Sequence, residues 1–430
     1  MSAPLRIGVV GLGTVGVGVI ELLTQHATML KRRCGRELAI VAVSARDRSR
    51  DRGIDLKDYR WVDEAVTLAA DPEVDVIVEL IGGSEGIAKK LIEDAIAAGK
   101  SVVTANKALI AHHGSDLARA AEQGGVTLAF EAAVAGGIPI LKAVRESLAG
   151  NRISSVYGIL NGTCNYILAA MQESGSEFAD ALAEAQALGY AEEDPAFDVD
   201  GIDAAHKLTI LTSLAFGCNV DFDSVHVEGI RNVTPTDIAF AEELGYRIKL
   251  LAIARETEYG IEQRVHPCMV PADTPIAHVG GVFNAVVVEG DHVDRTVFEG
   301  RGAGAGPTAS AVAADLVDIA RGLKAPTFAV PASNLVTAEH AAMEHHIGPY
   351  YIRLRVVDRP GVMADIAAIL RDERVSIESL LQHGRSPDEA VPVVLTVHDT
   401  GERSMTAALA KIDRLDTVLE PPHVIRIEPL

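Results

Sequence analysis

LRIGVVGLGTVG, residues 5–16, is the stretch that predicts the fold of the first third of the chain. It begins with an apolar run typical of a buried strand, and it is followed by VGVIELL, which has the spacing of a helix. Its glycines form a GxGxxG pattern, which permits a tight turn, close approach of the backbone to a pyrophosphate and a free helix N-terminus. We therefore predict a Rossmann domain that binds a dinucleotide. The residues expected at the cofactor are Gly11, Gly13, Thr14, Val15 and Gly16.

Further apolar strands alternate with helical segments after this start, as in a doubly wound parallel sheet. The expected strands span residues 38–43, 74–80, 101–103 and 126–130. Ligands bind at the carboxyl edge of such sheets. The sequence TANK follows the third of these strands directly, so Thr104 and Lys107 are candidate ligand contacts. The alternative for Lys107 is an ordinary solvated lysine in the first turn of the next helix, where a cation opposes the helix dipole.

The end of the second strand bears on the choice of coenzyme. An acid there usually binds the ribose 2′-hydroxyl of NAD, whereas an arginine accommodates the 2′-phosphate of NADP. Arg46 stands at this position and favours NADP, with NAD as the alternative. The surrounding run ARDRSRDR has charges of both signs and is also typical of a solvated loop.

A second stretch, GYAEEDPAFDVDGIDAAHKL at residues 189–208, is rich in ionisable side chains. A helix is expected to begin at Asp200 and Gly201, which puts Asp203 and Lys207 one turn apart on the same face. The helix continues as LTILTSLAF, so it is expected to be buried. A buried ammonium group needs a partner, and the pair Asp203–Lys207 therefore predicts a reaction centre.

A purely structural interpretation of this stretch stays open. Asp200 and Asp203 also fit a helix N-cap with an acid three residues on, and Asp203 with Lys207 fits a surface ion pair worth about 0.3 to 0.5 kcal/mol. Against this, three more acids precede the helix, and clustered like charges are costly unless a cationic group binds among them. These acids are Glu192, Asp194 and Asp198.

The turn EAAVAGGIP at residues 131–139 follows the last strand of the first domain. Its small residues expose backbone carbonyls beside the carboxylate of Glu131, an arrangement able to bind a cation through oxygen ligands. A tight turn that packs against the cofactor explains the same glycines equally well.

The length of 430 residues predicts two or three domains. After the first domain, strands near 252–255, 262–270 and 284–289 predict an α+β domain with an open mixed sheet. A glycine-rich segment at 298–308 precedes a long helix. This segment is either a linker or a second cofactor contact, with Gly302 as the candidate and the helix returning to the first domain. From residue 350 the order strand, helix, strand, strand, helix, strand is ferredoxin-like.

These elements give the expected domain boundaries. They are a dinucleotide-binding domain at 1–140 completed by about 307–345, a substrate and dimerisation domain at 141–306, and a third domain at 350–430.

Composition excludes several kinds of partner. A net charge of −21 and a pI of about 5.1 argue against nucleic acid or an anionic membrane, because phosphate binding needs clustered basic residues. No signal peptide and no membrane-spanning run are recognised, so a cytoplasmic location is expected. The cysteines lack metal-ligand or disulfide spacing and are expected to be reduced. They are Cys34, Cys164, Cys218 and Cys268.

Several motifs occur together over essentially the full chain, and the ensemble resembles homoserine dehydrogenase. They are GLGTVG, TANK, FEAAVAGGIP, NGTCNYIL, GYAEEDPAFDVDGIDAAHK and GRGAGAGPTA. The later unit with the sequence DRPGV resembles an ACT domain. This resemblance implies NAD(P)-dependent interconversion of L-aspartate 4-semialdehyde and L-homoserine, on the route to threonine and methionine. No aspartate kinase domain precedes residue 1, so the monofunctional form is expected.

The resemblance also implies roles for particular residues. Lys207 is expected to be the general acid/base, and Lys107 to lie with cofactor and substrate. Glu192, Asp198 and Asp203 are expected to bind the amino acid or orient the lysine, and Thr163 to contact the substrate. The residues implied in a monovalent cation site, such as one for Na+, are Glu131, Val134, Gly136 and Ile138. A homodimer or homotetramer is expected, with an amino-acid effector, threonine, on the ACT domain.

Two other classes of function share parts of this pattern. A different semialdehyde or amino-acid dehydrogenase would have the same dinucleotide-binding half. A regulatory protein would use the last domain to sense an amino acid and the first to sense a redox cofactor, without turnover.

Overall fold

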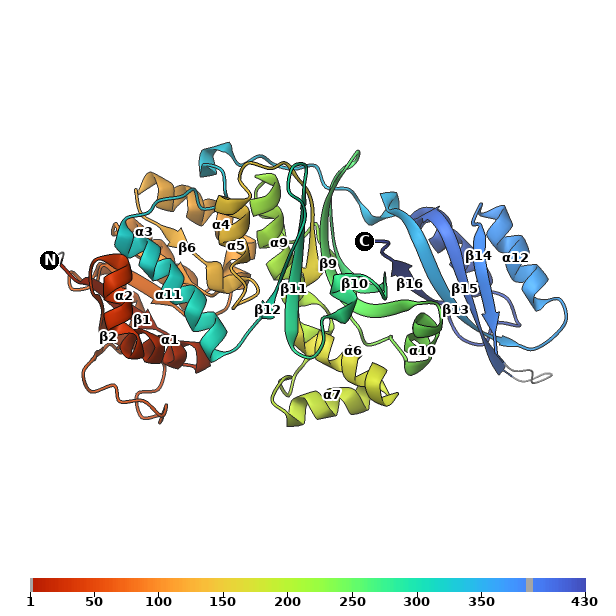
Figure 1. Ribbon diagram of the computed structural model, residues 1–430, viewed down its shortest axis with the longest axis horizontal. Coiled ribbons are helices and arrows are strands. Elements are labelled where there is room, and N and C mark those ends of the chain that lie inside the picture. The colour runs from red at the N-terminus through yellow and green to blue at the C-terminus, as the bar shows by residue number, and fades with distance from the viewer. Residues whose placement is uncertain (1–2, 384–389) are drawn as a thin grey trace.

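The computed structural model describes residues 3–383 and 390–430 (Figure 1). Its N-terminal part is a six-stranded sheet in the order β3-β2-β1-β4-β5-β6, with every neighbouring pair parallel. This is the Rossmann order, and it confirms the predicted doubly wound sheet. The predicted strand at 126–130 is shorter than expected. The strands are β1 (Leu5–Val10), β2 (Leu38–Ser44), β3 (Arg60–Trp61), β4 (Val76–Glu79), β5 (Ser101–Thr104) and β6 (Leu128–Ala129).

Helices cover both faces of this sheet, and one of them comes from far along the chain. In Figure 1 the late helix α11 lies beside the early helices α1 and α2. Gly18 of α1 permits this contact, because a Cβ there would lie 2.8 Å from the carbonyl oxygen of Ala305. The helices of this part are α1 (Thr14–Gln25), α2 (Ala27–Cys34), α3 (Ile87–Ala97), α4 (Lys107–Gln123), α5 (Ile140–Lys142) and α11 (Ala305–Arg321).

The second part is a mixed sheet with helices α6, α9 and α10 packed against it, as the sequence predicted. Three of its strands, β7, β8 and β12, were not predicted; β12 includes the start of the segment expected to be a glycine-rich connection. The strands are β7 (Ile153–Ile159), β8 (His226–Val227), β9 (Tyr246–Thr257), β10 (Gly260–Pro271), β11 (Phe283–Gly290) and β12 (Asp294–Arg301). The helices are α6 (Gly162–Ser174), α7 (Phe178–Ala187), α8 (Ala196–Val199), α9 (Ile202–Phe216) and α10 (Pro235–Glu243).

The C-terminal part has the predicted βαββαβ order, but its sheet is not separate. Strand β16 pairs antiparallel with β13 and parallel with β10, through Cys268 opposite Arg426 and Met269 opposite Ile427. One sheet therefore runs from β12 through β10 and β16 to β14 (Figure 1). The elements are β13 (Ile347–Val357), α12 (Val362–Asp372), β14 (Ile377–Gln382), β15 (Ala390–Gly401), α13 (Glu402–Ile412) and β16 (His423–Ile427).

Buried ion pairs line the seam between β10 and β16. Arg264 is fully buried, 2.9 Å from Glu262 and 2.5 Å from Glu428. Burial opposes ionisation of the Glu262 carboxyl, but the hydrogen bond from His346 and the charge of Arg264 outweigh burial and lower its pKa to about 2. Fully buried charges are stable only when they are paired. The seam therefore depends on Arg264, Glu262 and Glu428 together.

We expect Glu428→Ala to destabilise the chain by about 3 kcal/mol, because it leaves the buried Arg264 guanidinium with one carboxylate fewer. The matched control is Glu420→Ala, which breaks an exposed pair with Arg355 and should cost less than about 1 kcal/mol. Urea unfolding of both variants measures the difference. Equal losses of stability in the two variants would contradict the role assigned to the seam.

The described part of the chain contains no helix that is long and apolar enough to cross a membrane.

Candidate active site

A cavity of about 520 Å³ lies at the carboxyl edge of the parallel sheet, between that sheet and the helices of the mixed sheet. Lys107, Asp203 and Lys207 contribute to its wall. Its remaining polar and backbone lining comes from Asn161, Gly162, Thr163, Gly189, Tyr190, Asp198, Asn284, Arg301, Gly302, Ala303, Gly304 and Thr308. Apolar residues from the cofactor side, including Val15, Ala105 and Ala132, complete it.

Asp203 is the centre of the charged part of this cavity. It lies in the first turn of α9 and is only 4% exposed. Its Oδ2 is 2.6 Å from Nζ of Lys207, and its Oδ1 is 3.0 Å from Nζ of Lys107. The expected contact between Asp203 and Lys207 is present, and the alternative of a solvated surface pair is wrong because both side chains are buried. Lys107, the first residue of α4, is a third member of this cluster, and the residue spacing along α9 did not reveal it.

The three charges stabilise one another. Burial opposes ionisation of Asp203, but Lys207 and Lys107 outweigh burial and hold the pKa of its carboxyl well below the usual range. Burial also opposes the charge on Lys107, yet Asp203 raises the pKa of that ammonium. The carboxylate and both ammonium groups together carry a net positive charge, which complements an oxygen that becomes negative during a reaction.

Asn161 holds the acids of the site in place, and the sequence did not single it out. Its Nδ2 donates to Oδ1 of Asp198 at 2.7 Å and to Oδ2 of Asp203 at 2.9 Å. Its Oδ1 accepts from the backbone N–H of Cys164 and caps α6. An Asn before a helix is a recognisable cap, but only the fold brings this cap beside α9.

Of the other residues expected at the substrate, some line the cavity and others lie outside it. Asp198 lines the cavity, and burial together with Asp203 raises the pKa of its carboxyl. Thr163 lines it too and donates to the carbonyl oxygen of Tyr190 at 2.8 Å. Glu192 is exposed and outside the cavity wall, although its charge contributes to the raised pKa of Lys107. Asp194 accepts from the backbone N–H of Ala196 and shapes the loop.

The glycine turn fits a dinucleotide. Gly11 has a φ of 98°, and a Cβ there would lie 2.4 Å from the carbonyl oxygen of Leu80. At Gly16 a Cβ would lie 2.0 Å from the carbonyl oxygen of Gly11. Gly13, the residue before α1, faces open space instead, so the unpaired N–H groups that begin α1 can be approached by a pyrophosphate.

Two further expected cofactor residues lie apart from this turn. Arg46 is exposed just beyond the end of β2. Thr104 is fully buried and its side chain is not part of the cavity wall, because its hydroxyl donates to Oε2 of Glu79 at 2.6 Å. Glu79, which the sequence did not single out, also accepts from the backbone N–H groups of Ile81 and Gly82. Thr104 and Glu79 therefore shape the edge of the sheet.

The turn that follows β6 packs against the glycine-rich segment of β12 and α11. A Cβ at Gly136 would lie 2.6 Å from the carbonyl oxygen of Gly302. The Glu131 carboxylate accepts from the backbone N–H groups of Leu141 and Lys142, and burial together with nearby Asp315 raises its pKa to about 7. The carboxylate is thus committed to the start of α5, which leaves the backbone carbonyls as the oxygen atoms available to a cation.

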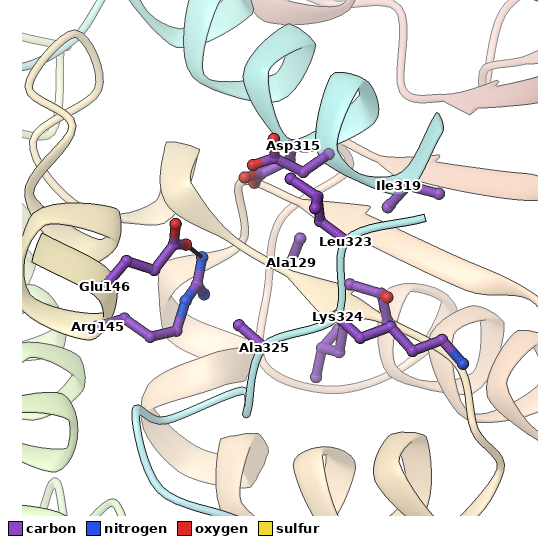
Figure 2. A pocket seen from close by; sticks show the side chains of 11 residues that line it. Ala129, Arg145, Glu146, Asp315, Ile319, Leu323, Lys324 and Ala325 are labelled. Carbon is purple, nitrogen blue, oxygen red and sulfur yellow. Dashed lines mark hydrogen bonds and ion pairs between the residues drawn. The ribbon is translucent and has the colours of Figure 1, made fainter. Parts of the chain in front are cut away.

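A second cavity, of about 220 Å³, lies behind this turn at the edge strand β6 (Figure 2). Arg145 and Glu146 pair across 2.9 Å on one side of it, and Asp315 of α11 lies on the other. Asp315 accepts from the backbone N–H of Glu131 at 2.9 Å. Asp315 also pairs with Lys142, whose Nζ lies 3.1 Å from Oδ1 of Asp315 and 2.5 Å from Oδ2 of Asp318. These contacts anchor the turn to α11.

The parallel sheet with its glycine turn, and the lysine–carboxylate cavity beside it, define a dinucleotide-dependent dehydrogenase. Residues 139–317 match the family model described as Homoserine dehydrogenase, and residues 11–131 match its NAD binding domain. Residues 350–417 match the ACT domain. The chain belongs to the homoserine dehydrogenase family.

Full-length relatives agree with this assignment. Homoserine dehydrogenases from Pseudomonas aeruginosa and Neisseria gonorrhoeae are each 48% identical to it, over 99% of both chains. The crystal structure of the enzyme from Thiobacillus denitrificans superposes with a TM-score of 0.94 at 47% identity, over 99% of this chain and 98% of that one. An archaeal homoserine dehydrogenase in complex with NADPH has a TM-score of 0.65 at 26% identity, over 75% of this chain and 99% of that one.

We expect Asn161→Ser to lower kcat/KM by about 10-fold or more while changing stability by less than about 1 kcal/mol. Serine retains the cap of α6, but it is too short to bridge Asp198 and Asp203. Steady-state kinetics and thermal unfolding measure the two effects. Unchanged kinetics, or a loss of activity explained by unfolding, would contradict the bridging role.

Proposed function

We propose that this enzyme reversibly reduces L-aspartate 4-semialdehyde to L-homoserine with NAD(P)H. The observation that carries the proposal is a single buried carboxylate, Asp203, between the ammonium groups of Lys107 and Lys207. This group lies in a cavity whose wall also includes Val15, which follows Gly13 in the glycine turn, and Ala105, which follows β5. Family membership supports the substrate pair.

Lys207 is the proposed proton donor. When bound, the reduced dinucleotide supplies a hydride to the aldehyde carbon, and the carbonyl oxygen then takes up a proton. An ammonium group has three N–H donors. In Lys207 one donates to Asp203 and one to the carbonyl oxygen of Leu160 at 2.7 Å, so the third can reach the substrate oxygen. In the reverse direction the neutral amine takes the proton from the alcohol.

The remaining residues of the site bind and orient the substrate in this proposal. Asp203 holds the two lysines, and Lys107 adds positive charge beside the developing oxyanion. Asp198, half-buried at the cavity wall, and the exposed Glu192 supply negative charge for the substrate ammonium group. Thr163 at the start of α6 is a further proposed contact.

NADP is the proposed coenzyme, with NAD as the alternative. One support is Arg46, which follows β2 and has an exposed side chain. The other is the NADPH named in the archaeal relative's structure. The other proposed cofactor contacts are Gly11, Gly13, Thr14, Val15, Gly16, Lys107 and Gly302. Comparison of kcat/KM for NADPH and NADH decides the preference.

We also propose a monovalent cation such as Na+ at the turn of Glu131, Val134, Gly136 and Ile138, bound through backbone carbonyl oxygens.

Threonine is the proposed effector of the ACT domain, and a homodimer or homotetramer is the proposed assembly. The proposed domains are 1–140 with 307–345, 141–306 and 350–430; contact between α1 and α11 supports the first. Inhibition by threonine is best measured on the full chain, because β16 belongs to the shared sheet.

Lys207→Met is expected to lower kcat by about 100-fold or more and to change coenzyme affinity by less than about twofold, because methionine fills the space but donates no proton. The matched control is Lys249→Met. Lys249 is also buried, at 4% exposure, but it donates to Asn165 and the carbonyl oxygen of Val279 outside the cavity.

Oxidation of NADPH at 340 nm with aspartate semialdehyde, and coenzyme titration by fluorescence, measure the two quantities. Turnover of Lys207→Met within a few-fold of the unmodified enzyme would refute the assignment. Faster turnover of another aldehyde would favour a different dehydrogenase, and coenzyme binding without turnover would favour a sensor.

A further inference from the structure

Asn284, the second residue of β11, is a buried amide at the wall of the active-site cavity. It is 1% exposed and lies directly against Gly302, where a Cβ would be 2.2 Å from its Cγ and Nδ2. A Cβ at Gly162, the first residue of α6, would lie 3.5 Å from its Oδ1. The absence of a side chain at Gly302 therefore creates the space that the amide occupies, whereas a Cβ at Gly162 would only be in ordinary contact with it.

The amide of Asn284 lacks hydrogen bonds that its buried neighbours possess. Across residues 3–383 and 390–430, neither its Oδ1 nor its Nδ2 has a partner. By contrast, Asn161 and Asn165 are equally buried, yet both use their donor and acceptor atoms. A buried polar group without a partner disfavours the state that contains it, so the vacant amide favours any ligand that can pair with it.

The chemistry of the two vacant atoms restricts that ligand. A carboxylate would pair only with Nδ2, and an ammonium group only with Oδ1, so either one leaves the other atom vacant. A primary carboxamide offers one acceptor and one donor in a plane, and it satisfies both atoms at once. The reaction has one such group, the carboxamide of the nicotinamide ring.

The position of Asn284 agrees with this chemistry. It shares the cavity wall with Val15 of α1, with Ala105, which follows β5, and with the segment from Gly302 to Gly304. Gly302 of that segment lies directly against the buried amide, and Gly304 has a φ of 117°, a conformation that glycine adopts without strain. Both polar atoms are buried, so the pairing of a ligand group with Asn284 requires this glycine backbone to shift.

We propose that Asn284 positions the cofactor, its side-chain amide forming a pair of hydrogen bonds with the carboxamide of the nicotinamide ring. This assignment rests on the proposed dinucleotide reaction. The paired amides would fix the rotation of the ring about its bond to the ribose, and thereby determine which face of the ring is turned toward Lys207.

The test is a binding comparison without substrate, by isothermal titration calorimetry on the full chain. The ligands are the oxidised coenzyme that binds more tightly, NADP+ or NAD+, its 3-acetylpyridine analogue, and the nicotinamide-free 2′-phospho-ADP-ribose or ADP-ribose. The analogue keeps the carbonyl acceptor but lacks the N–H donor. The variants are Asn284→Leu, of similar volume, Asn284→Ala as a second truncation, and Asn334→Leu as a control at an exposed asparagine.

We expect the unmodified enzyme to bind the coenzyme about fivefold more tightly than the analogue, the usual effect of one hydrogen bond. Asn284→Leu should bind the coenzyme about 10- to 30-fold more weakly and no longer distinguish it from the analogue. Its affinity for the nicotinamide-free ligand should stay within about twofold of the unmodified value, as should all affinities of Asn334→Leu.

A second readout needs no ligand. Replacing an unpaired buried amide with an apolar side chain of the same shape should raise the melting temperature of the ligand-free Asn284→Leu chain, by about 2 °C.

Three results would overturn the proposal. The first is unchanged coenzyme affinity in both Asn284 variants. The second is a loss of affinity for the nicotinamide-free ligand as large as the loss for the coenzyme. The third is unchanged coenzyme affinity with a raised KM for the aldehyde. The last would assign Asn284 to the substrate. Failure of the unmodified enzyme to bind any dinucleotide would instead refute the proposed function itself, and the unmodified protein alone reveals that outcome.

Discussion

The structure depends on one buried carboxylate. Asp203 accepts from Lys207 on its own helix and from Lys107 on the first helix turn after β5, so it joins the two sheets at the point where they meet. An ammonium group in an apolar helix is unstable without such a partner. The helix α9, its capping turn and the carboxyl edge of the parallel sheet therefore have to take up one relative arrangement, which is also the arrangement that forms the cavity.

Other features of the fold maintain that arrangement. The segment between α9 and α10 connects the start of α9 to the seam with the C-terminal part: the backbone N–H of Ile230 donates to Val199, and that of Glu228 donates to Val265. Glu228 in turn pairs with Arg426 of β16 at 2.9 Å. The ACT domain is thus connected to the residues that precede Asp203 by hydrogen bonds and ion pairs, and not only by a linker.

The sequence predicted elements whose signals are local. The glycine turn, the helix that carries Asp203 and Lys207, and the βαββαβ order were all recognisable, because strand and helix periodicity and backbone requirements are readable in short windows. Contacts across the fold were not. Lys107 beside Asp203, the bridge made by Asn161, the buried Glu79 behind Thr104 and the insertion of β16 beside β10 each join residues far apart in the chain. Strand β12 was missed because its glycines and charges resemble a loop.

The pH dependence of Asp203→Asn tests the central role of this carboxylate most directly. Burial lowers the pKa of Lys107 and Asp203 is the largest influence that raises it, so a neutral replacement of Asp203 leaves only Asp198 and Glu192 to oppose burial. We predict that the basic limb of the pH profile of kcat moves to lower pH in Asp203→Asn, with coenzyme affinity preserved. An unshifted basic limb, at any level of residual activity, would contradict the view that Asp203 maintains the positive charge of the site.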